Sequence, residues 1–158
     1  MQFVGISNMG MYTGLRFKVI VKEKYREKLN DILNTPVDTD EDGDGYPMWR
    51  HIPGLPGSKY WSEIPSCNRI PWGLVDGMPD KWDREEHILG NSTFNKETGE
   101  WRVICSLKNY GGEISRFMSW VLRPITEDVK YIEVLYEEQD EIMEAKWYSL
   151  KDLKEGYY

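Results

Sequence analysis

Apolar and polar residues alternate along the stretch GLRFKVIVKEKY, near the start of the chain. The positions on one side of this alternation are all apolar: Leu15, Phe17, Val19 and Val21. A period of two predicts a strand with one buried face. From residue 24 the period becomes helical, and the apolar positions of KYREKLNDILN share one face: Tyr25, Leu29, Ile32 and Leu33. We therefore predict a helix over 24–34 that ends before Pro36.

A second block of regular patterns begins after residue 90. STFNKETGEWRVICSL predicts a hairpin with strands near 91–95 and 100–107, joined by a turn in which Gly99 takes a positive φ. The face predicted to be buried on its second strand is Trp101, Val103, Cys105 and Leu107. A helix is predicted over 113–122, closed by Pro124, with the apolar stripe Ile114, Phe117, Met118, Val121 and Leu122.

The stretch DVKYIEVLYEEQDE, which follows, alternates with apolar residues on both sides. One side is Val129, Tyr131, Glu133 and Leu135, and the other is Ile132, Val134 and Tyr136. This pattern predicts a central strand, because both faces of such a strand are buried. MEAKWYSL predicts a last strand, followed by a polar tail.

The predicted order is strand, helix, insertion, two strands, helix and two strands. Two strand–helix units with hairpins indicate an α+β class, specifically a ferredoxin-like sandwich with a mainly antiparallel sheet and two helices on one face. A length of 158 residues suits a single domain, 1–158. The insertion at about 36–90 would lie over an edge or the other face of the sheet.

This insertion has its own composition, with seven of the eight prolines and four of the seven tryptophans. A long irregular segment in a compact domain is often functional. Aromatic rings stack on planar ligands, and arginine binds phosphate or carboxylate. The candidate ligand- or partner-binding residues are Trp49, Arg50, His51, Tyr60, Trp61, Arg69, Trp72 and Trp82, with Lys108 and Glu137 from later segments. The alternative is that these aromatic residues form a small core that holds the insertion together.

The stretch DTDEDGDG has the ligand spacing of an EF-hand calcium loop, with Asp38, Asp40 and Asp42 as candidate metal ligands. The twelfth position of that loop requires a bidentate glutamate, but it is Trp49. Two further interpretations stay open: a solvated acidic loop, and an acidic contact surface for a partner. Apart from this calcium site, no cofactor is predicted.

A net charge of −7 argues against general binding to nucleic acids or to anionic lipid surfaces, because phosphate would be repelled. No apolar run reaches the roughly 20 residues of a membrane span, and MQFVGISNMG does not have the pattern of a signal peptide. Two cysteines in a chain of this size favour a reducing compartment, so we expect a cytoplasmic protein.

Catalytic residues are sparse in this sequence. Cys105 alternates with apolar residues in a predicted strand and is expected in the core, whereas Cys67 with His51 or His87 could form a dyad. Their spacing does not favour such a dyad, and it also fits a zinc site poorly. We therefore predict that the protein is not an enzyme.

Three stretches occur in a recognisable order: GLRFKVIVKEKYREKL, IPWGLVDGMPDKWD, and FNKETGEWRVICSLKNYGGEI followed by VKYIEVLYEE. Together they resemble a family of small phage and prophage proteins of Firmicutes, and a broader ferredoxin-like family of plasmids and phages. The resemblance covers about two thirds of the chain. It implies a mobile-element origin and a setting in the host cytoplasm, and it implies no reaction.

Three functions from different classes follow. The first is a non-enzymatic phage-type accessory protein that binds a host protein and sequesters or blocks it, as an inhibitor of antiviral defence would. The second is a sponge for a small nucleotide signal, with an aromatic and arginine pocket. The third is a small hydrolase that uses His51 or His87.

Overall fold

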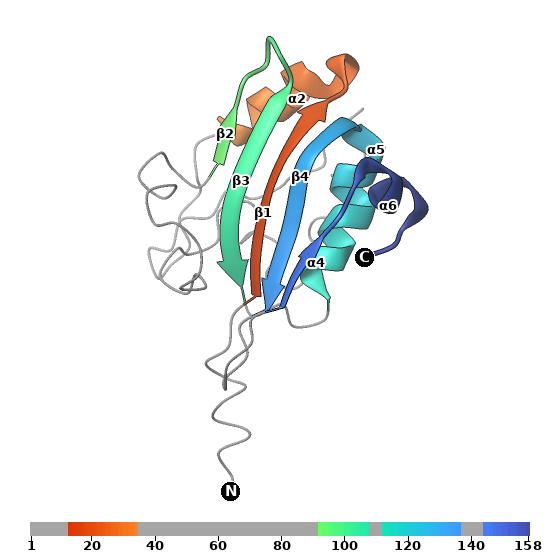
Figure 1. Cartoon of the computed structure of the whole chain (residues 1–158). Helices are drawn as coiled ribbons and strands as arrows, with labels where there is room; N and C mark the ends of the chain where they lie inside the picture. The colour runs from red at the N-terminus through yellow and green to blue at the C-terminus, as the bar shows by residue number, and fades with distance from the viewer. Residues whose placement is uncertain (1–12, 35–91, 108–111, 137–143) are drawn as a thin grey trace, which may run out of the picture.

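A computed structural model describes residues 13–34, 92–107, 112–136 and 144–158 of the chain (Figure 1). The strands are β1 (Thr13–Val21), β2 (Ser92–Phe94), β3 (Glu100–Leu107), β4 (Thr126–Tyr136) and β5 (Glu144–Trp147). The helices are α2 (Glu23–Leu33), α4 (Glu113–Phe117), the π-helical turn η3 (Met118–Leu122), α5 (Arg123–Ile125) and α6 (Leu150–Glu155). The expected α+β class is confirmed.

The strands form one sheet in the order β2-β3-β1-β4-β5, and all neighbouring pairs are antiparallel. β1 lies at the centre, paired along its length with β3 on one side and β4 on the other (Figure 1). The predicted strand, helix, hairpin, helix and two strands are therefore all present, in the predicted sequence order. None of the described helices is both long enough and apolar enough to cross a membrane.

The main core lies between one face of the sheet and the helices. From the sheet it takes the apolar sides of β1 and β3, together with Ile132. From the helices it takes Leu29, Ile32, Ile114, Phe117, Met118, Val121, Leu122, Ile125 and Leu153. Phe17, Trp101 and Phe117 meet at its centre, with ring centroids 5.1 to 6.2 Å apart. The predicted buried stripes of the first strand, the hairpin and both helices are thus confirmed.

The hairpin turn before β3 is tied to helix α2. Gly99 has φ +80°, as predicted, and its backbone carbonyl accepts a hydrogen bond of 2.8 Å from the N–H of Val21. Arg26 of α2 reaches the same place: its Nε donates to the Val21 carbonyl at 2.9 Å and its Nη1 to the Glu97 carbonyl at 3.1 Å. One arginine therefore joins the helix, the end of β1 and the turn.

The prediction that Pro124 closes the second helix is wrong. The helix widens to a π-turn at 118–122 and continues through Pro124 to Ile125 before Thr126 becomes extended. Proline lacks an N–H, and its ring clashes with the carbonyl four residues earlier in a regular α-helix. In the π-turn the N–H of Arg123 bonds to the Met118 carbonyl five residues back, and this wider turn accommodates the proline ring.

The predicted face of Val129 is also wrong. The register of β1 with β4 shifts between Lys18 and Val19, so that Lys18 pairs with Tyr131 but Val19 pairs with Val129. This β-bulge adds one residue to β4 and reverses the alternation beyond it. Val129 consequently packs on the main core, on the same face as Ile132.

The segment after β5, predicted as a polar tail, contains helix α6 (Leu150–Glu155). Ser149 accepts a hydrogen bond from the N–H of Asp152, whose side chain accepts one from the N–H of Ser149, which completes a capping box. Leu153 is buried in the core, and Lys154 donates to the carbonyls of Arg123 and Thr126 at 2.7 and 2.8 Å. The helix therefore packs against the start of β4.

Candidate functional site

The candidate site residues predicted from the sequence lie outside the described part of the chain. In segment 35–91 these are Asp38, Asp40, Asp42, Trp49, Arg50, His51, Tyr60, Trp61, Arg69, Trp72 and Trp82, together with Cys67 and His87. Lys108 and Glu137 lie in the segments 108–111 and 137–143. The aromatic binding surface, the calcium site and the histidine-dependent hydrolase therefore stay predictions. The site described below is built from other residues.

The sheet face opposite the main core is a candidate binding surface. The described helices pack their buried side chains on the core face, so we call the opposite face the helix-free face. Residues directly opposite one another in an antiparallel pair point to the same face. The register therefore arranges this face in three rows across the strands. They are Ala145–Leu135–Gly14–Ser106, Trp147–Glu133–Arg16–Ile104, and Tyr131–Lys18–Arg102–Thr93.

An ion pair lies at the centre of the helix-free face. Arg16 Nε donates to Glu133 Oε2, and the two side chains are 19% and 4% exposed. Apolar side chains flank the pair: Ile104 and Leu135 are fully buried and form a small cluster with Ala145. Removing charges from water is costly, so the carboxylate of Glu133 is kept in this position by the guanidinium that faces it.

The row beside this ion pair has a different character. Lys18 lies directly opposite Arg102 on β3, and directly opposite Tyr131 on β4. All three side chains are half-buried. Thr93 of β2 completes the row beyond Arg102. The row therefore carries two cations between two hydroxyl-bearing residues.

Among the described residues of the helix-free face, Trp147 is the large aromatic residue that is exposed. Trp147 of β5 lies opposite Glu133, and 57% of it is exposed to solvent. Tyrosine and tryptophan are enriched where proteins contact one another, because a large rigid ring buries much area at a small entropy cost. Trp147 therefore marks the edge of the face where a macromolecular partner could pack.

Acidic side chains near the bulge are already paired with cations. Lys130 Nζ lies 3.1 Å from Asp128 Oδ2, and this hydrogen bond, with a further one from the backbone of Val129, lowers the pKa of Asp128. Glu127 lies 4.0 Å from Arg26. The described residues contain no group of three or more His, Cys, Asp or Glu side chains with the geometry to hold a metal ion.

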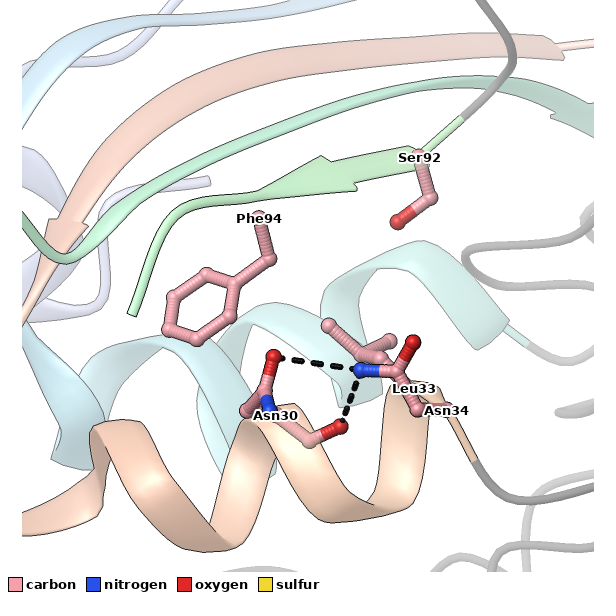
Figure 2. Close-up of a pocket in the computed structure, with 5 residues that line it drawn as sticks. All are labelled: Asn30, Leu33, Asn34, Ser92 and Phe94. Atoms are coloured by element: carbon pink, nitrogen blue, oxygen red, sulfur yellow. Dashed lines mark hydrogen bonds between the residues drawn. The ribbon is translucent and has the colours of Figure 1, made fainter. Parts of the chain in front are cut away.

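A small pocket opens on the other side of the sheet, between the end of α2 and β2. Its volume is about 120 Å³, and it is lined by Asn30, Leu33, Asn34, Ser92 and Phe94. Figure 2 shows Ser92 and Phe94 pointing from β2 toward the helix. Asn34 Nδ2 donates to the carbonyl and to Oδ1 of Asn30, at 2.7 and 3.1 Å. The pocket lies beside Asn34 and Ser92, the two described residues that flank segment 35–91. It was not predicted from the sequence.

Cys105 is a core residue, as expected. It is fully buried among the apolar side chains of the main core, and this burial raises the pKa of its thiol to about 12. The thiolate is the nucleophilic form of cysteine. Cys105 therefore remains a neutral, apolar packing residue at neutral pH.

The residues of the helix-free face are not among the candidates predicted from the sequence, although a signal for them is present there. The alternation of the first strand already placed Arg16 and Lys18 on one side, and Glu133 interrupted an otherwise apolar central strand. A buried glutamate requires a partner, so a search for a cation on a neighbouring strand would have pointed to Arg16. Trp147 gave no such signal, because an exposed and a buried tryptophan look alike in a short strand.

Comparisons with protein family models, with curated proteins and with solved structures give no match to this chain. The likeness to phage and prophage proteins therefore depends on the three sequence stretches alone and remains a hypothesis about the chain's origin.

Proposed function

We propose that this is a non-enzymatic accessory protein of a phage or related mobile element, which acts in the host cytoplasm. It binds a host protein and sequesters or blocks it, as an inhibitor of antiviral defence does. One observation carries the binding role: Trp147 is largely exposed on the helix-free face, next to the buried ion pair of Arg16 and Glu133. The phage origin is supported by the sequence resemblance only.

The strand order supports a ferredoxin-like assignment for the scaffold. The elements β1, α2, β2, β3, α4 and β4 follow one another as strand, helix, two strands, helix and strand. β3 lies between β1 and β2 and is antiparallel to both, which is the split arrangement of that fold. The described helices pack on one side of this scaffold, and on the other side Trp147 is exposed on the edge strand β5. β5 and α6 extend this arrangement at the far edge.

The chemistry of the helix-free face suits a protein partner. Interfaces concentrate their binding energy in a few tryptophan, tyrosine and arginine residues, surrounded by contacts that exclude water. Here Trp147 lies beside fixed charges on a rigid sheet, so little conformational entropy is lost when a partner packs on it. The aromatic residues of segment 46–83 remain a second predicted contact region.

A quantitative pull-down tests this function. Tagged wild-type protein would be incubated with lysate of the host, and bound proteins measured by mass spectrometry. We expect one host protein to be enriched, and its recovery to fall at least tenfold for Trp147→Ala, since hot-spot truncations cost about 2 kcal/mol or more. Tyr157→Ala is the matched control, because Tyr157 is also an exposed aromatic residue, 67% accessible, but follows α6.

A second arm, Trp61→Ala, tests the predicted contact region in the insertion. The proposal is contradicted if no host protein is specifically enriched, or if Trp147→Ala and Trp61→Ala both recover it as well as the wild type does. Loss with Tyr157→Ala alone would also contradict it, because the contact would then lie near the C-terminal helix.

A further inference from the structure

The pocket between the end of α2 and β2 has the size of a single ring. Its volume is about 120 Å³, and an engineered apolar cavity of roughly 150 Å³ in another protein binds benzene. Leu33 and Phe94, two of the residues that line the pocket, also pack against the main core. The walls are therefore fixed to the packed part of the fold, and the space suits a molecule with one six-membered ring.

One buried tryptophan sets the position of the β2 wall. Trp101 of β3 is fully buried and lies directly opposite Phe94 in the register of the sheet. Its indole Nε1 donates a hydrogen bond of 3.3 Å to the hydroxyl oxygen of Ser92. Ser92 and Phe94 are two residues apart on one strand, so both point to the same face, toward α2 (Figure 2). A hydroxyl group and an aromatic ring are thus both presented to the pocket.

The amide groups of two asparagines form the α2 wall. Asn34 Nδ2 donates to the backbone carbonyl of Asn30 at 2.7 Å and to Asn30 Oδ1 at 3.1 Å, as Figure 2 shows. A backbone carbonyl can only accept, so the donating atom of Asn34 is its nitrogen and the accepting atom of the Asn30 side chain is its oxygen. These two bonds therefore fix the orientation of both amides.

The polar groups of this lining have unused hydrogen-bonding capacity. Within the described part of the chain, the side-chain oxygen of Asn34 accepts no hydrogen bond and the side-chain nitrogen of Asn30 donates none. The Ser92 hydroxyl accepts from Trp101 and keeps its own hydrogen to donate. None of the five lining residues is charged. The pocket therefore offers two donors, one acceptor and an aromatic ring to an uncharged molecule.

We propose that this pocket binds an uncharged, planar, single-ring amide, which is the chemistry of a pyrimidine base. An amide within a ring carries an N–H donor next to a carbonyl acceptor, and these groups complement the oxygen of Asn34 and the nitrogen of Asn30. Bases stack on aromatic side chains, and Phe94 supplies such a ring. A charged ligand is disfavoured, because it would lose water and find no counter-charge in the lining.

This inference is independent of the host partner proposed above. The pocket lies on the core side of the sheet, whereas that partner is proposed to contact Trp147 on the helix-free face. Failure of one proposal therefore leaves the other unaffected.

Nuclear magnetic resonance titration of the isotope-labelled full chain with uracil tests the site. A ligand of this size makes few contacts, so we expect saturable shifts with a dissociation constant of about 1 mM, the weak end of the usual affinity range. The shifted signals should include the side-chain amides of Asn30 and Asn34 and the indole N–H of Trp101. Shifts of these three groups place uracil in the pocket, because they report on its two walls.

Two variants test the contacts with the ligand. Asn34→Ala removes the acceptor at an exposed position and should weaken binding about fivefold, the effect of one uncharged hydrogen bond. Phe94→Leu keeps an apolar side chain but removes the stacking ring, and should weaken binding about tenfold. Ser115→Ala, at an exposed position of α4, is the control and should bind uracil as the wild type does. If Phe94→Leu does not fold, Asn34→Ala still decides, because its side chain is exposed.

A second ligand tests the role of the Asn34 oxygen. Dimethyluracil, methylated at both ring nitrogens, keeps the ring and both carbonyls but has no N–H to donate. We expect it to bind about tenfold more weakly than uracil, because the Asn34 oxygen is then left without a donor. Equal binding of the two ligands, or unchanged affinity of both variants, would overturn the proposal. The proposal also fails if uracil causes no saturable shifts of the three groups up to about 10 mM.

Discussion

Glu133 and Arg16 lie directly opposite each other on β4 and β1, and the guanidinium of Arg16 donates a hydrogen bond to the Glu133 carboxylate. Glu133 is only 3% exposed. The pair therefore places a charge inside the sheet that is tolerated only because its partner is fixed on the neighbouring strand.

Removing one member of this pair should destabilise the protein strongly. We expect Arg16→Met to lower the free energy of unfolding by about 3 kcal/mol, because it leaves a buried carboxylate without its cation. The double variant Arg16→Met with Glu133→Leu should recover most of this loss, since no uncompensated charge remains. Urea denaturation followed by circular dichroism measures both. If the single variant is as stable as the wild type, the pair is not buried in solution.

Gly99 should be intolerant of any side chain. Its φ is +80°, and a Cβ added there would lie against Arg26 and 2.6 Å from the Val21 carbonyl oxygen, which is backbone and cannot move aside. We expect Gly99→Ala to cost about 3 kcal/mol, from an unfavourable backbone conformation and the clash together.

Gly156 provides the matched control for that substitution. Its φ of +81° is almost the same, but the nearest atom to an added Cβ is 3.7 Å away. Gly156→Ala should therefore cost only about 1 kcal/mol, the conformational part alone. The two variants would be compared by thermal unfolding, and the difference between their losses of stability measures the clash. Equal losses would show that Arg26 and β1 do not approach the turn this closely.

The capping box of α6 should contribute measurably to stability. Ser149→Ala removes the acceptor for the Asp152 N–H and should lower the free energy of unfolding by about 1 kcal/mol. Ser115→Ala, at an exposed position within α4, should change it by less than about 0.5 kcal/mol. Chemical denaturation of both variants compares them. A larger loss for Ser115→Ala would place the stabilising contact elsewhere.

The thiol of Cys105 should be unreactive in the folded protein. Its burial should also make the free energy of unfolding fall at high pH. Its thiol has a pKa of about 12 when buried, against 9.0 as the ordinary value, so the unfolded chain releases this proton first. The unfolded state therefore binds fewer protons between those values, and stability decreases as pH rises from about 9 toward 12. Cys105→Ala should flatten that part of the profile, measured by urea midpoints at several pH values.

Alkylation checks the same residue more directly. At pH 8 in native buffer, peptide mapping should find Cys105 unmodified by iodoacetamide, and in guanidinium chloride it should find full modification. Rapid labelling of native Cys105 would contradict its burial.

Local sequence patterns were sufficient for most of the described elements. The alternation around Phe17 and Val103, the helical stripe around Leu29, and Gly99 at the turn each depend on neighbours in sequence, and each was predicted correctly. The errors at Val129 and Pro124 have one common cause. A bulge and a π-turn each insert a residue into a regular period, and the alternation or helical stripe of the sequence does not show where the insertion falls.

The sequence alone therefore determined which stretches become strands and helices and which sides of them are apolar, because those properties repeat at fixed local intervals. Only the tertiary structure decided which polar residues meet. The pairing of Arg16 with Glu133, and the juxtaposition of Lys18 with Arg102, depend on strand order and register between segments separated by many residues. Register is set by the packing of whole faces, so no local pattern contains it.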